Sequence, residues 1–104
     1  TAVANDYGYQ HVYERLIEGV GHKGDVLFGI STSGNSVNIV NAFKKAKEMG
    51  MTTVGMTGMN EGKMTSLSDY IINVPSNITP RIQEMHILVG HIICELTERE
   101  LFKD

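Results

Sequence analysis

The chain has 104 residues, 41% of them hydrophobic and 20% charged, which is typical of one small globular domain. A formal net charge of -3 gives no reason to expect nucleic acid or an anionic membrane as a partner. No apolar run approaches the roughly 18 residues that cross a bilayer, and the single cysteine, Cys94, excludes an internal disulfide. We therefore expect a cytoplasmic protein, with Cys94 buried and unreactive among apolar neighbours.

Hydrophobic periodicity predicts an alternation of helices and strands along the chain. Leu16 and Ile17 belong to an apolar pattern with helical spacing, whereas the continuous apolar run before Ser31 is typical of a strand buried on both faces. In chain order, we expect a helix over about 11–20, a strand over 26–30, a helix over about 37–49, a strand over 52–57, a loop over 58–68 and a strand over 70–74.

A last helix is expected over about 81–101. Thr79 suits its N-cap and Pro80 its first position, where the missing N–H costs nothing. Its apolar residues recur at helical spacing, and we expect the face that they form to pack on the sheet. This face comprises Met85, Val89, Ile92 and Leu96.

The alternation of strands with helices predicts an α/β fold, with a parallel sheet between two layers of helices. Three strands make a thin sheet. We therefore expect either a further N-terminal portion or close pairing with another chain.

A loop rich in serine follows the first predicted strand and precedes a helix. In open α/β sheets, ligands bind at the carboxyl ends of the strands, and a helix N-terminus there suits a phosphate. The loop carries four hydroxyls but no lysine or arginine, and the hydroxyls belong to Ser31, Thr32, Ser33 and Ser36. The spacing alone leaves two interpretations open, a phosphate-binding loop and a hydroxyl-rich turn with a serine N-cap.

Four segments carry a resemblance to a known family. Residues 25–36, DVLFGISTSGNS, resemble the phosphate-binding motif of sugar-isomerase (SIS) domains, which have a flavodoxin-like fold. Residues 5–9, 62–64 and 81–87, together with His91, resemble the corresponding segments of the phosphoheptose isomerase group. The likeness covers essentially the whole chain.

The resemblance implies an aldose–ketose isomerase that converts sedoheptulose 7-phosphate to D-glycero-D-manno-heptose 7-phosphate, a precursor of lipopolysaccharide. It further implies a homo-oligomer, usually a tetramer, and a zinc ion held in part by Gln83 and His91. His91 would be the catalytic residue. The substrate-binding residues implied are Asp6, Ser31, Thr32, Ser33, Ser36 and Gln83.

The spacing of the last helix is compatible with these roles. Gln83, Ile87 and His91 are separated by four residues each and form one stripe, away from the predicted packing face. Imidazole can transfer protons near neutral pH or bind zinc. A partly buried histidine bonded to nearby backbone remains the alternative for His91. His86 lies on a different side of the helix, so we do not expect it to share a metal with His91.

The chain also departs from the family pattern. Family members normally carry a longer N-terminal region, with a first strand and with a His and a Glu that complete the metal and acid–base sites. Residues 1–104 are therefore expected to form a partial SIS domain that is inactive alone, because two ligands fall short of the three usual for catalytic zinc. Some members also carry an aspartate at the position of Pro80. A non-catalytic SIS regulator, binding a sugar phosphate or the replication initiator, is the alternative, and His91 favours the enzyme.

Overall fold

The computed structural model describes residues 8–60 and 62–103. Its three strands form one parallel sheet in the order β1–β2–β3. The strands are β1 (Val26–Ile30), β2 (Thr52–Thr57) and β3 (Tyr70–Asn73), and the helices are η1 (Tyr9–His11), α2 (Val12–Val20), α3 (Val37–Glu48), α4 (Met64–Leu67) and α5 (Thr79–Leu101). Within the described ranges, no helix combines the length and the apolar character needed to cross a membrane.

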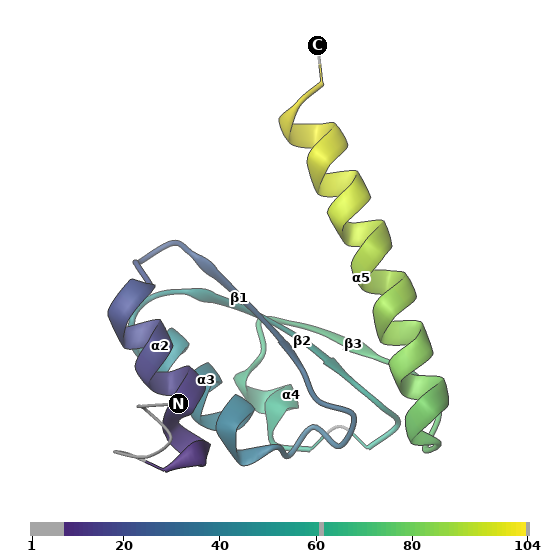
Figure 1. Cartoon of the computed structure of the whole chain (residues 1–104), viewed down its shortest axis with the longest axis horizontal. Helices are drawn as coiled ribbons and strands as arrows, with labels where there is room; N and C mark the ends of the chain where they lie inside the picture. The colour runs from purple at the N-terminus through teal and green to yellow at the C-terminus, as the bar shows by residue number, and fades with distance from the viewer. Residues whose placement is uncertain (1–7, 61, 104) are drawn as a thin grey trace.

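The helices lie in two layers on opposite sides of the sheet, so the predicted three-layer α/β arrangement is confirmed. Helices α2, α3 and α4 lie on one side, and α5 lies on the other and extends past the strands with its C-terminal half (Figure 1). Strands β1 and β2 pair in register, with Gly29 opposite Gly55. This places the carboxyl ends of the strands, the serine loop and the N-terminal half of α5 at one edge of the sheet.

The core lies between the sheet and α3. Phe43 of α3 and Met64 of α4 are fully buried there. Gly29 allows α3 to approach β1 closely, since a Cβ at this position would lie 2.2 Å from Cε1 of Phe43. A strand residue with any side chain would therefore push α3 away from the sheet.

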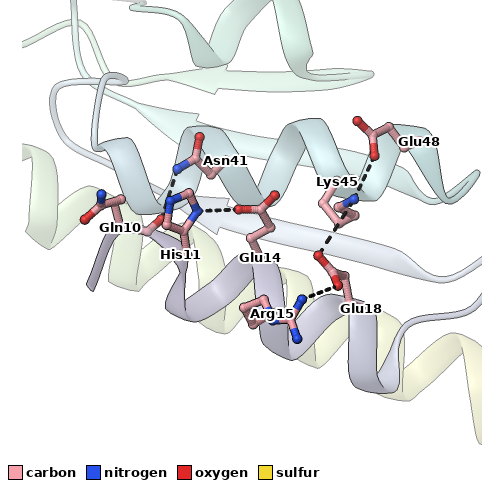
Figure 2. A network of polar contacts seen from close by, with 8 residues as sticks. All are labelled: Gln10, His11, Glu14, Arg15, Glu18, Asn41, Lys45 and Glu48. Carbon is pink, nitrogen blue, oxygen red and sulfur yellow. Dashed lines mark hydrogen bonds and ion pairs between the residues drawn. The ribbon is translucent and has the colours of Figure 1, made fainter. Parts of the chain in front are cut away.

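Polar contacts fix α2 against α3 on the outer surface (Figure 2). Lys45 Nζ of α3 lies 2.8 Å from the Glu48 carboxylate and 3.7 Å from the Glu18 carboxylate of α2. The Glu48 hydrogen bond is the largest cause of a raised pKa at Lys45. Just before α2, the carbonyl of Gln10 in η1 accepts a hydrogen bond from Asn41 Nδ2 of α3 at 3.0 Å.

The structure corrects two predictions about burial on the α5 side of the sheet. Strand β1 is not buried on both faces, because Val26 and Ile30 are exposed. The predicted packing face of α5 is also wrong, since Met85 and Ile92 are exposed, as is Leu96. The buried residues of α5 are instead Ile82 and the polar His86.

Three local predictions are also wrong. Ile78 is the N-cap of α5, and the helix already includes Thr79, which makes no cap. The predicted loop over 58–68 contains the short helix α4. Cys94 is exposed and not buried.

Candidate functional site

The serine loop, residues 31–36, connects β1 to α3 and closes on itself through hydroxyl contacts. The Oγ atoms of Ser31 and Ser36 lie 2.8 Å apart, and those of Ser31 and Ser33 lie 3.4 Å apart. Ser31 is buried and its Oγ also accepts the backbone N–H of Gly34 at 3.1 Å. Gly34 has a φ of 70°, in the left-handed region that favours glycine. The three serine hydroxyls that the sequence predicted to act together do converge.

Helix α3 begins directly after this loop. Ser36 is its N-cap, but no side-chain hydrogen bond caps the helix, because the Ser36 hydroxyl meets Ser31 instead. A helix N-terminus carries partial positive charge and backbone N–H groups that lack intrahelical partners. The converging hydroxyls therefore lie where a helix can best stabilise a dianion.

The segment after β2 braces the serine loop from outside. Lys63 donates its backbone N–H to Oδ1 of Asn35 at 2.8 Å, and Met64 donates its own to the carbonyl of Gly34 at 3.0 Å. Gly62 has a φ of 64°, and a Cβ there would lie 2.4 Å from the Gly34 carbonyl oxygen. Residues 62–64, which carried part of the family resemblance, therefore have a structural role in fixing the loop.

A small cavity of about 160 Å³ opens beside the loop. Thr32 and Ser33 form one wall, and polar residues from the ends of β2 and β3 form the others. The sequence analysis did not predict these other walls, although the polar residues that follow β2 and β3 could have indicated them. The residues it missed are Asn60, Ser76, Asn77 and Thr79.

A larger cavity of about 660 Å³ lies between α5 and β1, and both polar residues predicted on α5 line it. Gln83, Ile87 and His91 form the expected stripe along one wall. The opposite wall includes Phe28 and Ile30 of β1, so the stripe faces the sheet and not away from it. Gln83 and His91 are exposed.

The structure thus brings the predicted residues together in two groups. Ser31, Thr32, Ser33 and Ser36 form the loop at the sheet edge, and Gln83 and His91 line the larger cavity beside it. Ile82 contributes to the small cavity from α5, which connects the two groups along one helix. Asp6, the remaining predicted substrate contact, lies outside the described residues.

The donor set offered to a metal is small. Gln83 supplies an amide oxygen and His91 an imidazole nitrogen, whereas catalytic zinc generally takes three protein ligands. Within residues 8–60 and 62–103, no group of three or more His, Cys, Asp or Glu side chains could hold a metal ion. These residues alone therefore do not fit a complete zinc site.

Comparison with known proteins decides the family. A family model described as "SIS domain" matches residues 1–58, more than half of the chain. The chain belongs to the SIS domain family. This SIS domain is 56% identical over 104 residues to the phosphoheptose isomerase of Sulfurimonas denitrificans, covering 100% of this chain and 53% of that protein. It is 58% identical over 99 residues to the phosphoheptose isomerase of Helicobacter pylori strain P12, covering 95% of this chain and 52% of that protein.

Solved structures show the same relationship for the SIS domain. The phosphoheptose isomerase of Neisseria gonorrhoeae matches with a TM-score of 0.88 and 45% identity, over 91% of this chain and 54% of that chain. The phosphoheptose isomerase of Francisella tularensis matches with a TM-score of 0.87 and 33% identity. The chain spans about half the length of the curated relatives it matches.

Proposed function

We propose that the protein containing these residues is a phosphoheptose isomerase, which converts sedoheptulose 7-phosphate to D-glycero-D-manno-heptose 7-phosphate. The observation that carries the proposal is the convergence of the Ser31, Ser33 and Ser36 hydroxyls at the N-terminus of α3. The names of the relatives supply the substrate, and they support isomerisation over the regulatory alternative.

The serine loop would bind the phosphate end of the substrate. Hydroxyl and backbone N–H donors can surround the phosphate oxygens, while the α3 dipole favours their negative charge. The cavity beside Thr32 and Ser33 would receive the carbons next to the phosphate. Because no cationic residue lies within 31–36, phosphate binding by this loop would depend on accurately placed neutral hydrogen-bond donors.

The reacting end of the sugar would lie along α5. Isomerisation requires a base that removes a proton from the carbon next to the carbonyl, and an acid that delivers a proton to the former carbonyl carbon. The electron pair of the broken C–H bond forms the C=C bond of an enediolate, and the carbonyl π pair moves to the carbonyl oxygen, which takes up a proton. As the second C–H bond forms, the neighbouring hydroxyl loses its proton and becomes the new carbonyl. His91 is an exposed imidazole on this wall that can transfer such a proton, and the Gln83 amide can orient a sugar hydroxyl. No carboxylate lines this cavity within the described residues, so the second proton-transfer group would come from elsewhere in the protein.

We propose that the protein is a cytoplasmic homo-oligomer, a tetramer on the family pattern. Helix α5 supports this, because it exposes apolar side chains four residues apart at Leu88, Ile92 and Leu96. Such a stripe is the pattern of a helix that packs against other helices. Zinc is proposed on the resemblance alone, and no step above depends on it.

Replacing Ser31 and Ser33 together with alanine tests the proposal. Hydrogen bonds to a charged group contribute about 1.5–3 kcal/mol each, so affinity for sedoheptulose 7-phosphate should fall about a hundredfold or more. Ser66→Ala removes an exposed hydroxyl from α4, outside the loop, and is the matched control. Calorimetric titration should show wild-type affinity for the control.

The affinity of the double variant is decisive only if the variant is folded. Because Ser31 is buried, circular dichroism should first establish that the double variant is folded, and Ser33→Ala alone supplies a milder variant at an exposed position. Retention of wild-type affinity by a folded double variant would contradict the proposal.

A further inference from the structure

His86 is a buried histidine that the proposed reaction does not use. It is 3% exposed, and its Nε2 lies 2.9 Å from the carbonyl oxygen of Thr57 at the end of β2. A carbonyl only accepts hydrogen bonds, so Nε2 carries the proton. Nδ1 is then an acceptor, and it is buried without a partner among the described residues.

The carbonyl that His86 contacts belongs to a peptide group that also holds the serine loop. The same peptide carries the N–H of Gly58, and this N–H donates to the carbonyl of Thr32 at 3.1 Å. Two hydrogen bonds in series therefore connect the imidazole on α5 to the backbone of the serine loop. Thr57 and Gly58 are both buried, so water does not compete for either bond.

The Thr57–Gly58 peptide is closely packed against its neighbours. A Cβ on Gly58 would lie 2.5 Å from Cδ1 of Ile82 and 2.9 Å from the Thr32 carbonyl oxygen. Ile82 and His86, the two buried residues of α5, therefore both meet the Thr57–Gly58 peptide. This contact region therefore helps to place α5 relative to the serine loop.

We propose that His86 is a positioning residue, which fixes Gln83 and His91 relative to the serine loop through the Thr57–Gly58 peptide. This role rests on the proposed function, in which the loop holds the phosphate and α5 faces the reacting carbons. The phosphate and the carbonyl lie at opposite ends of a seven-carbon chain, so binding the phosphate does not by itself align the reacting atoms. Misplacement by about 1 Å can cost a hundredfold in rate.

A set of variants at His86, made in the protein that contains these residues, tests the role in turnover. His86→Leu keeps apolar bulk but removes the donor to Thr57, and kcat should fall about tenfold or more while KM changes little. His86→Gln returns an N–H donor to a similar place and should recover most of kcat. Val89→Ala, which trims a half-buried side chain on the same helix, should lower thermal stability and leave kcat per folded molecule unchanged. Wild-type kcat in folded His86→Leu, or equal losses in the Leu and Gln variants, would overturn the proposal.

A second measurement needs no turnover and separates this proposal from the isomerase function. A long-range ¹H–¹⁵N spectrum of the wild-type protein should show His86 protonated on Nε2. Hydrogen exchange of the Gly58 amide should become faster in His86→Leu but not in Val89→Ala. Protonation on Nδ1, or unchanged exchange at Gly58, would refute the link. Absence of turnover by the wild-type protein that contains these residues would instead refute the proposed function. The two spectroscopic measurements would then test the link between His86 and the serine loop by themselves.

Discussion

Asp69 and Thr53 exchange hydrogen bonds where β2 and β3 begin. The Asp69 carboxylate accepts the backbone N–H of Thr53 at 2.9 Å, and the backbone N–H of Asp69 donates to the carbonyl of Thr53 at 2.9 Å. Lys47 Nζ of α3 lies 3.1 Å from the same carboxylate. The backbone hydrogen bond, followed by the Lys47 contact, holds the pKa of the Asp69 carboxyl below its usual value. One side chain thus joins two strands and a helix on the side of the sheet away from α5.

The lowered pKa of Asp69 predicts a loss of stability in acid. A carboxyl with a depressed pKa in the folded state stabilises the protein above its unfolded pKa, about 3.9, and this contribution disappears as pH falls through the folded value. Asp69→Asn should therefore be less stable than wild type at pH 7, and the gap should narrow below about pH 4. Urea unfolding at several pH values measures the gap.

Lys47→Met provides the control for this pH dependence. It removes the second cause of the depressed pKa and leaves the backbone hydrogen bond in place. The part of the free energy of unfolding that is lost in acid should be smaller in Lys47→Met than in wild type, but it should not vanish. A gap between wild type and Asp69→Asn that stays constant from neutral pH to about pH 3 would show that the carboxylate charge has no such role.

Gly62→Ala should disturb the serine loop far more than the same substitution at Gly24. Both Gly62 and Gly24 have positive φ, so alanine at either position costs about 1 kcal/mol in backbone strain. Only at Gly62 does the added Cβ also collide with the Gly34 carbonyl, whereas Gly24 faces open space. We expect Gly62→Ala to weaken sugar-phosphate binding at least tenfold.

Gly24→Ala is the matched control for this collision. It should lose a similar amount of stability through backbone strain and keep the affinity of the wild type. Isothermal titration with sedoheptulose 7-phosphate distinguishes the two variants. Equal affinities in the two alanine variants would mean that residues 62–64 do not set the loop geometry.

The serine loop could be predicted from the sequence because its signals are local. An apolar strand, a run of hydroxyl residues and an amphipathic helix follow one another within residues 26–48, and each is indicated by neighbouring residues. The convergence of Ser31 and Ser36 then follows from a tight connection between β1 and α3. The bounds of β1 and β2 were predicted correctly for the same reason.

The orientation of α5 could not be predicted in this way, because this helix carries apolar residues around most of its circumference. Ile82, Ile87 and Leu88 lie on different sides, and periodicity favoured a side that is exposed. His86 faces inward since the carbonyl of Thr57 needs a donor, which depends on a residue 29 positions away. The exposure of Ile30 and Cys94 likewise depends on what packs against that face, and the sequence of one strand or helix does not encode its neighbours.

Glycine-to-alanine changes at Gly29 and Gly19 should shift stability in opposite directions. A Cβ on Gly29 would overlap the Phe43 ring, and overpacking of a core costs about 1–3 kcal/mol. Gly19 lies exposed in α2 with open space around its Cα, so alanine there should add about 0.5–1 kcal/mol through helix propensity. Equilibrium unfolding in urea measures both changes.

A double-mutant cycle with Phe43→Leu isolates the collision at Gly29. Phe43→Leu alone should destabilise the protein, because it removes volume from a fully buried site. In the Gly29→Ala background the same change should cost less, since the smaller side chain makes room for the new methyl group. A coupling of about 0.5 kcal/mol or more between the two sites is expected. Strict additivity would show that α3 moves away from β1 without resistance, contrary to a core in which Gly29 sets the distance between helix and sheet.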